Sequence, residues 1–187
     1  VEIKVAALKC GVAMLQGAQK EIQAGVKHVD DSFYVVCRRM LRTFKRQFIQ
    51  KRKLLKSEGI TTAATISEDL KAVLKEMMNF DDMEILLRFL QLLCEGHNEI
   101  MQEYLREQSQ NTVSVNILAE IVETIHFSLK TLSHMSISAV LQAINTLTEL
   151  VQGPCVNNQV CIMQLGIVDT INYILSAPFE YVDKQGT

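Results

Sequence analysis

Tryptophan is absent from this chain, and proline occurs only at Pro154 and Pro178. Because proline interrupts helices most strongly, its scarcity beside many Leu, Ile, Met, Gln and Glu residues favours α-helix. No apolar run reaches the roughly 18 residues that a membrane-spanning helix needs, and no signal-peptide pattern opens the chain. The first residue is Val1 rather than Met and lies in a predicted helix, so we expect a fragment of a longer polypeptide.

Motifs of the common catalytic and cofactor sites are also missing. The sequence contains no G-x-S-x-G, P-loop, dinucleotide-binding, H-E-x-x-H or EF-hand pattern, so we do not expect an enzyme. The five cysteines are scattered through apolar runs, which predicts buried free thiols in a reducing compartment rather than disulfides. Cys155 and Cys161 have no His nearby in the sequence, so buried thiols are also preferred to a zinc site.

The chain does contain enough apolar material for a helical domain. Of its 187 residues, 48% are hydrophobic and 21% charged, and the formal net charge is −2. Disordered chains are poorer in apolar residues, so we expect a packed core. The length fits one domain or one segment of a larger protein.

Hydrophobic residues recur with helical periodicity along nearly the whole chain. The clearest helix spans 32–56, and the apolar residues of its one face are Phe33, Val36, Cys37, Met40, Leu41, Phe44 and Phe48. Asp30, Asp31 and Ser32 supply N-terminal capping chemistry, and Gly59 ends the helix. We also predict a loop over 61–66 and helices over 1–15, 67–78, 81 or 82 to 94, 98–108, 114–133, 137–151, 156–163 and 167–176.

A short pattern repeats around three glycines, Gly17, Gly96 and Gly153. Six residues after each glycine stands a glutamine, at Gln23, Gln102 and Gln159. A helix that ends at a C′ glycine and is followed at once by a second helix produces such a pattern. Recurring helix-turn-helix units indicate an all-α, armadillo-like α-solenoid of stacked units. The glycines are 79 and 57 residues apart, so further helices must lie between the units.

One segment is strongly basic. Nine of the 19 basic residues fall within 38–56, with no acidic residue among them. The candidate partner-binding residues in it are Arg38, Arg39, Arg42, Lys45 and Arg46. A basic amphipathic helix can bind calmodulin, anionic lipid or nucleic acid, and nucleic acid is the least favoured here. The simpler alternative is a helix whose apolar face packs in the solenoid while its charged face is solvated or meets an acidic neighbour.

Two motifs resemble a known family. LLRFLQLLCEGHNEIMQEYLREQ (86–108), followed by LTELVQGPCVNNQ (147–159), is similar to the homology-associated domain of the intracellular calcium-release channels. These channels are the inositol trisphosphate receptors and the ryanodine receptors. A looser likeness, AMLQGAQKEIQ (13–23) followed by SFYVVCRRM (32–40), is to the helical segment that precedes this domain.

The resemblance implies a regulatory Ca²⁺ site. In this family, glutamates of the two motifs help bind activating Ca²⁺, and they correspond here to Glu95 and Glu149. His97 and Gln152 match neighbouring positions that could orient the site, and a segment near the C-terminal end of the pore supplies its third part. Both glutamates are predicted in the last turn of a helix, where a carboxylate is disfavoured by about 0.3–1 kcal/mol unless a cation is near. Because Ca²⁺ takes about six to eight oxygen ligands, we expect weak binding by this segment alone.

The implied function is that of a cytosolic segment of a ligand-gated calcium-release channel, which relays ligand binding to the pore. The implied location is the cytosolic face of the endoplasmic or sarcoplasmic reticulum membrane, and the implied partners are other domains of the same polypeptide in a tetrameric channel. One alternative is an armadillo-like protein-interaction scaffold in which both glutamates are ordinary surface residues. Another is a lipid- or calmodulin-binding module. The expected parts are a solenoid segment over 1–60 that ends in the basic helix, the loop over 61–66, and the homology-associated domain over 67–187.

Overall fold

A computed structural model describes most of the chain. The described residues are 2–28, 30, 32–59, 67, 69, 70, 72, 73, 80–129 and 137–176. Within them all regular secondary structure is α-helical, which confirms the predicted all-α class. No helix among these residues is both long enough and apolar enough to span a bilayer.

Except for α2, for which no range was predicted, the helices follow the ranges that periodicity predicts. They are α1 (Glu2–Leu15), α2 (Lys20–Val26), α3 (Ser32–Ser57), α5 (Phe80–Cys94), α6 (Glu99–Arg106), α7 (Ile117–Leu129), α8 (Ile137–Val151), α9 (Val156–Gln164) and α10 (Ile167–Ser176). The predicted helix over 67–78 lies largely outside the described residues, although the Ser67 hydroxyl accepts a hydrogen bond from the Leu70 amide at 3.3 Å, as a cap does. The predicted loop over 61–66 lies entirely outside them.

Local signals define both ends of α3. The carboxylate of Asp30 accepts a hydrogen bond from the Ser32 amide at 2.7 Å, and hydrogen bonding to the Ser32 side chain and to this amide lowers the pKa of Asp30. At the other end, Gly59 adopts a φ of +67°, a left-handed conformation that glycine takes without steric cost. One face of the helix is buried and the opposite face carries the basic residues.

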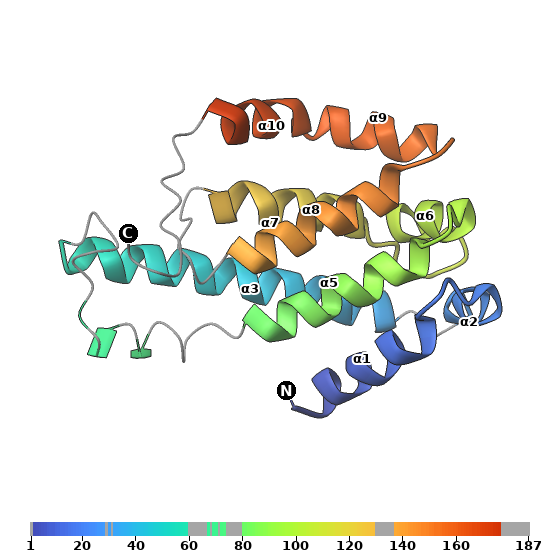
Figure 1. The fold of residues 1–187 in the computed structure, drawn as a ribbon, viewed down its shortest axis with the longest axis horizontal. Coiled ribbons are helices and arrows are strands. Elements are labelled where there is room, and N and C mark those ends of the chain that lie inside the picture. The colour runs from blue at the N-terminus through green and yellow to red at the C-terminus, as the bar shows by residue number, and fades with distance from the viewer. Residues whose placement is uncertain are drawn as a thin grey trace.

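In the described part of the chain, the helices form three successive groups of three: α1–α2–α3, α5–α6–α7 and α8–α9–α10 (Figure 1). Helix α5 packs between α1 and α8, and α7 packs against both α3 and α10. Helix α6 likewise packs against α9. In these pairs the equivalent helices of neighbouring groups therefore lie side by side, and the third helix of each group adds to the spacing between the glycines.

The three glycines lie in the turns between the first and second helices of each group. Gly17, Gly96 and Gly153 have φ values of +80°, +79° and +79°, which confirms the predicted C′ role. The turns also stack. A Cβ atom on Gly96 would lie 3.2 Å from the Cβ of Ala18, and one on Gly153 would lie 3.4 Å from Nδ1 of His97. Glycine therefore both ends the helix and lets the preceding turn approach.

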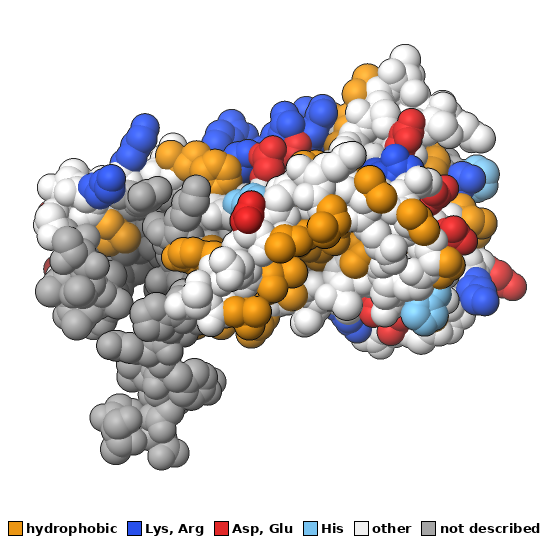
Figure 2. Space-filling view, turned by 90° about the horizontal axis from the view of Figure 1, so that it is seen from above, with side chains coloured by type: hydrophobic (Ala, Val, Ile, Leu, Met, Phe, Trp, Pro, Cys, Tyr) orange, Lys and Arg blue, Asp and Glu red, His pale blue; other side chains and the backbone are white. Residues whose placement is uncertain are grey.

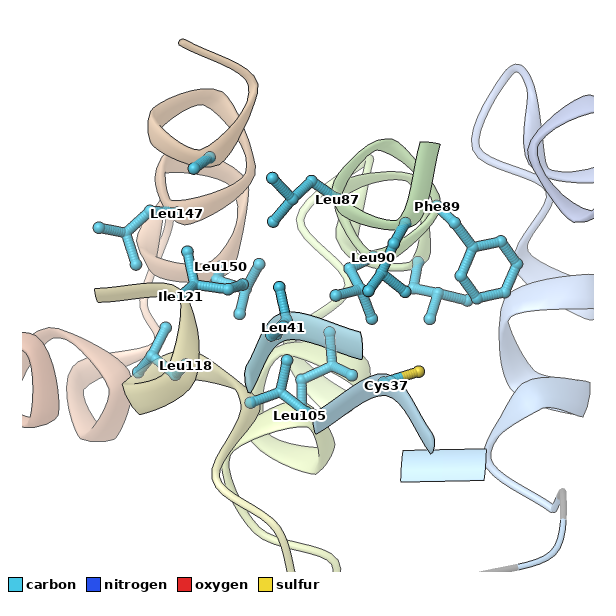
Figure 3. Close-up of a cluster of buried hydrophobic side chains, with 14 of the residues drawn as sticks. Cys37, Leu41, Leu87, Phe89, Leu90, Leu105, Leu118, Ile121, Leu147 and Leu150 are labelled. Atoms are coloured by element: carbon cyan, nitrogen blue, oxygen red, sulfur yellow. The ribbon is translucent and has the colours of Figure 1, made fainter. Parts of the chain in front are cut away.

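A continuous apolar core joins the three groups. Figure 3 shows side chains from different groups in one cluster, among them Leu41 of α3, Leu87 and Leu90 of α5, and Leu147 of α8. All four are almost fully buried. Removing this much apolar surface from water is the main stabilising contribution to the fold.

The cysteines are free, as the sequence predicts, but they are not all buried. Cys37, Cys94 and Cys155 are buried, and burial raises the pKa of Cys37 to about 12. Cys161 is half-buried. The prediction was wrong for Cys10, which is exposed because α1 packs against α5 through only one side.

Candidate functional site

Glu95 and Glu149 lie at the ends of two neighbouring helices. Glu149 is in the last turn of α8, as predicted. Glu95 directly follows Cys94, the last residue of α5, rather than lying inside the helix. Its amide bonds to the carbonyl of Leu92, three residues back, at 3.4 Å, so the chain already turns out of the α-helix there. Because α5 and α8 pack side by side, both carboxylates belong to the same end of this helix pair.

The two carboxylates interact electrostatically. Partial burial raises the pKa of Glu149, and the negative charge of Glu95 raises it further. The charges of His97 and Arg88 and a hydrogen bond from Gln152 act in the opposite direction. Two glutamates 54 positions apart in the sequence are thus close enough for the charge of Glu95 to raise the pKa of Glu149.

The structure brings the two predicted neighbours to the same place. The side-chain amide of Gln152 donates a hydrogen bond to Oε2 of Glu149. His97 has a positive φ of +57°, and its exposed ring lies against the turn at Gly153. The predicted residues therefore converge from the turn after α5 and from the end of α8.

One carboxylate oxygen of this cluster has no hydrogen-bond partner in the part of the chain that the structure describes. Oε2 of Glu95 is buried and accepts no hydrogen bond from any described residue. Leaving a buried carboxylate oxygen unpaired is costly, and a cation is one group that would pair it. Within the described residues this oxygen therefore stays unpaired.

Two glutamines hold the helix ends that carry the carboxylates. Gln23 of α2 donates its amide to the carbonyls of Leu92 and Glu95 at 2.8 and 2.9 Å. Gln102 of α6 donates to the carbonyls of Glu149 and Gln152 at 2.6 and 3.0 Å. Both glutamines are fully buried. They are the residues at the sixth position after each turn glycine, so the repeat pattern marks them, although sequence reasoning gave them no role.

The donor set fits a hard cation in kind but does not complete its shell. Carboxylate oxygens are the ligands that Ca²⁺ prefers, and about six to eight oxygens are required. The backbone carbonyls of Glu95 and Glu149 already accept hydrogen bonds from Gln23 and Gln102. Among the described residues, no group of three or more His, Cys, Asp or Glu side chains is arranged to hold a metal ion.

The basic residues of α3 divide into two sets. The guanidinium of Arg42 bonds to the largely buried carboxylate of Glu120 on α7 at 2.6 Å. Lys45 pairs with Glu123 and lies 4.9 Å from the centre of the Phe127 ring. For these two residues the simpler interpretation holds, since α3 meets an acidic neighbour. In Figure 2, red acidic side chains lie among the blue basic ones along the upper edge of the molecule.

Of the remaining basic candidates, Arg39 and Arg46 are exposed and Arg38 is half-buried. Arg46 bonds to the carbonyl of Arg42 and to the hydroxyl of Thr43, both on its own helix. Arg38 and Arg39 form no ion pair within the described ranges. The apolar face beneath them is buried in the core, through Tyr34, Cys37, Leu41 and Phe44. In this conformation α3 therefore offers a partner its charged side only.

Comparison with known proteins identifies the family. A family model described as RyR and IP3R homology associated matches residues 77–175, a little over half of the chain. The chain belongs to this family. The inositol 1,4,5-trisphosphate receptor itr-1 of Caenorhabditis elegans is 39% identical over 87 residues, which cover 41% of this chain. The chain covers only 3% of the length of that receptor.

The family match contains the whole carboxylate cluster. Glu95, His97, Glu149 and Gln152 all lie within 77–175, whereas α1, α2 and the basic helix α3 lie outside it. The homology-associated region is thus the part of the chain that carries the candidate site.

Proposed function

We propose that this chain is a cytosolic segment of a ligand-gated intracellular calcium-release channel, in which Glu95 and Glu149 supply two ligands of an activating Ca²⁺ site. Membership of the family supports the first part. The observation that carries the second is the effect of the Glu95 charge on the pKa of Glu149, together with the unpaired buried oxygen of Glu95. A bound cation would relieve both the repulsion and the unpaired oxygen.

The residues of this chain prepare the site. Gln152 orients one carboxylate, and Gln23 and Gln102 fix the two helix ends from which the glutamates project. Bound Ca²⁺ would supply the positive charge that the cluster lacks. Water and other domains of the same polypeptide, including a pore-side segment, provide the remaining oxygens, so the chain alone binds Ca²⁺ weakly.

The proposed role in gating is to link domains. The three groups of helices form part of an armadillo-like α-solenoid that transmits displacement from ligand-binding domains to the pore of a tetrameric channel. This channel lies in the endoplasmic or sarcoplasmic reticulum membrane, with the segment on its cytosolic face. Ca²⁺ binds more tightly when the solenoid and the pore-side segment are arranged as in the open state. The difference in its binding free energy between the open and closed states is the amount by which it favours opening.

The test is the Ca²⁺ dependence of the full-length channel. Glu95→Gln and Glu149→Gln each keep the size of the side chain but remove its charge and replace one acceptor oxygen with an NH2 donor. We expect the Ca²⁺ concentration for half-activation to rise by about tenfold or more, as loss of metal-site residues commonly does. Glu21→Gln, at an exposed position on α2, is the control and leaves activation unchanged. Normal Ca²⁺ activation in both site variants would instead support the scaffold function, with no Ca²⁺ role.

A second role is supported by the basic side of α3. We infer that Arg38 and Arg39, which have no acidic partner within the described residues, bind an anionic lipid surface. Calmodulin is less favoured because it binds the apolar face of its target helix, and the apolar face of α3 is buried here. Replacing both arginines with Glu should abolish salt-sensitive sedimentation of the chain with phosphatidylserine vesicles. Unchanged sedimentation would contradict this role.

A further inference from the structure

Helices α8 and α9 form the outer face of the third group. In the first two groups, the next group along the chain covers the equivalent face. In α5, three residues contact α8 through hydrogen bonds to Ser138, Thr146 and Gln142. These α5 residues are Glu84, Leu87 and Gln91, which stand 12, 9 and 5 positions before the turn glycine. The residues at the same positions in α8 are Leu141, Ile144 and Thr148. Leu141 is 55% exposed and Thr148 is exposed, whereas Ile144 is half-buried against the core, so the described residues leave much of this face uncovered.

The second helix repeats this relationship. In α6, the residues that contact the third group are Gln102, Glu103 and Arg106, which bond to the end of α8 and to Asn157 and Asn158 of α9. The residues at the same positions in α9 are Gln159, Val160 and Met163. Val160 is 48% and Met163 59% exposed. Figure 2 views the molecule from the side where α9 and α10 lie in Figure 1, and apolar side chains are spread across that face.

Gln159 is the third glutamine of the repeat, and it differs from the first two. Gln23 and Gln102 reach across to the last carbonyls of the first helix in the next group. Gln159 is exposed and donates instead to Val151 and Gly153 of its own hairpin, at 3.0 and 2.9 Å. Its amide thus lies at the repeat position from which Gln23 and Gln102 cap the first helix of the next group.

We propose that the outer face of α8 and α9 is a docking surface for a further helical hairpin of the same kind. The first helix of that hairpin lies along Leu141 and Ile144, and its last carbonyls accept the amide of Gln159. Its turn glycine lies on Pro154, which occupies the position that His97 has above Gly153. This occupant is chosen because the surface continues an interface that the chain already forms twice, between α1 and α5 and between α5 and α8.

The chemistry of the face also limits the occupant. The six equivalent positions in α8 and α9 carry no charged side chain, whereas those in α5 and α6 include Glu84, Glu103 and Arg106. A charged partner surface would lose its hydration there without gaining an ion pair. The facing side of the docked hairpin is therefore uncharged and largely apolar.

The experiment measures the accessibility of single introduced thiols in the full natural polypeptide. Val160→Cys lies on the proposed surface, and Val113→Cys, between α6 and α7, is the matched control because both valines are 48% exposed. Cys10→Ser removes the exposed native thiol from the background. Maleimide labelling of each position is followed by mass spectrometry of the peptide that contains it.

In the isolated chain, the thiols introduced by Val160→Cys and Val113→Cys should label at similar rates. In the full polypeptide, the thiol at position 160 should label at least about tenfold more slowly than in the isolated chain, since labelling then requires the hairpin to open. Adding Gln159→Met should restore labelling at this position by about three- to tenfold, the effect of losing the capping hydrogen bonds.

Three results would overturn the proposal. Equal labelling at position 160 in the isolated chain and in the full polypeptide would show that nothing docks on α9. Protection that Gln159→Met leaves unchanged would show that the occupant is not a helix capped by this residue. Protection that appears in the isolated chain as its concentration rises would identify a second copy as the occupant.

Discussion

The side-chain amide of Gln102 bonds to the backbone carbonyl of Glu149 at 2.6 Å. Gln102 lies in α6, in the same group of helices as Glu95. It therefore holds the end of α8, which carries Glu149, from the group that carries Glu95. Gln23 makes the equivalent bond one group earlier, to Glu95 itself. The relative position of the two carboxylates therefore depends on buried amides rather than on the glutamate side chains.

Gln102→Met tests how much these buried hydrogen bonds contribute to the stability of the chain. The substitution keeps the apolar stem and leaves two carbonyls without their donor, so we expect the free energy of unfolding to fall by about 1–3 kcal/mol. Urea denaturation of the chain measures it. Gln159→Met is the matched control: its equivalent bonds are exposed to water, so its cost should stay within about 0.5 kcal/mol. Equal losses in the two variants would contradict the buried capping role of Gln102.

Glu149→Gln should stabilise the chain at neutral pH when Ca²⁺ is absent. Burial and the charge of Glu95 raise the pKa of Glu149 above its ordinary value of 4.5. The folded state then holds this proton more tightly than the unfolded chain, so stability falls as pH rises from 4.5 through the raised pKa and stays lower above it. Glutamine removes this loss, and the midpoint of thermal unfolding should rise by about 1 °C at about pH 7.5.

The pH dependence provides the control for that prediction. At about pH 4 the carboxyl of Glu149 is mostly protonated in both states, so the two proteins should unfold at nearly the same temperature. Circular dichroism in a buffer with a Ca²⁺ chelator gives both midpoints. A variant that unfolds at a lower temperature than the parent at about pH 7.5 would show that the Glu149 charge is stabilised rather than strained in the apo state.

Helix ends could be predicted from the sequence because neighbouring residues determine them. Asp30 caps α3 across two positions, and Gly59, Gly96 and Gly153 adopt the left-handed conformation that ends a helix. These effects need no tertiary contact, so composition and spacing are enough to locate them.

The grouping of helices in threes could not be predicted in the same way. The pairing of α3 with α7 joins Arg42 to Glu120 across 78 positions, and no local pattern specifies such a partner. Likewise, only the resemblance to a family paired Glu95 with Glu149, because their proximity results from the packing of α5 on α8. The sequence shows that each of these glutamines follows a turn glycine by six residues. Their capping role could not be predicted, because it requires the end of a neighbouring helix within reach of the amide.

Gly11 and Gly25 should respond to alanine with opposite signs. A Cβ on Gly11 would lie 2.5 Å from Cε2 of the buried Phe89 ring, so Gly11→Ala should destabilise by about 1–3 kcal/mol through overpacking between α1 and α5. A Cβ on Gly25 of α2 meets no atom within 4 Å, so Gly25→Ala should stabilise by about 0.5 kcal/mol by restricting the unfolded chain. Denaturant midpoints compare the two. A neutral Gly11→Ala would mean that α1 can shift away from α5.

Arg42 should contribute to folding rather than to partner binding. Its guanidinium pairs with Glu120, whose side chain is only 9% exposed, so Arg42→Ala leaves a nearly buried carboxylate without its partner. We expect a loss of about 1–2 kcal/mol in the free energy of unfolding, and a clearly smaller loss when Glu120 is already Gln. Arg39→Ala, at an exposed position, should change stability by less than about 0.5 kcal/mol. If Arg42→Ala is as neutral as Arg39→Ala, the pair does not join α3 to α7.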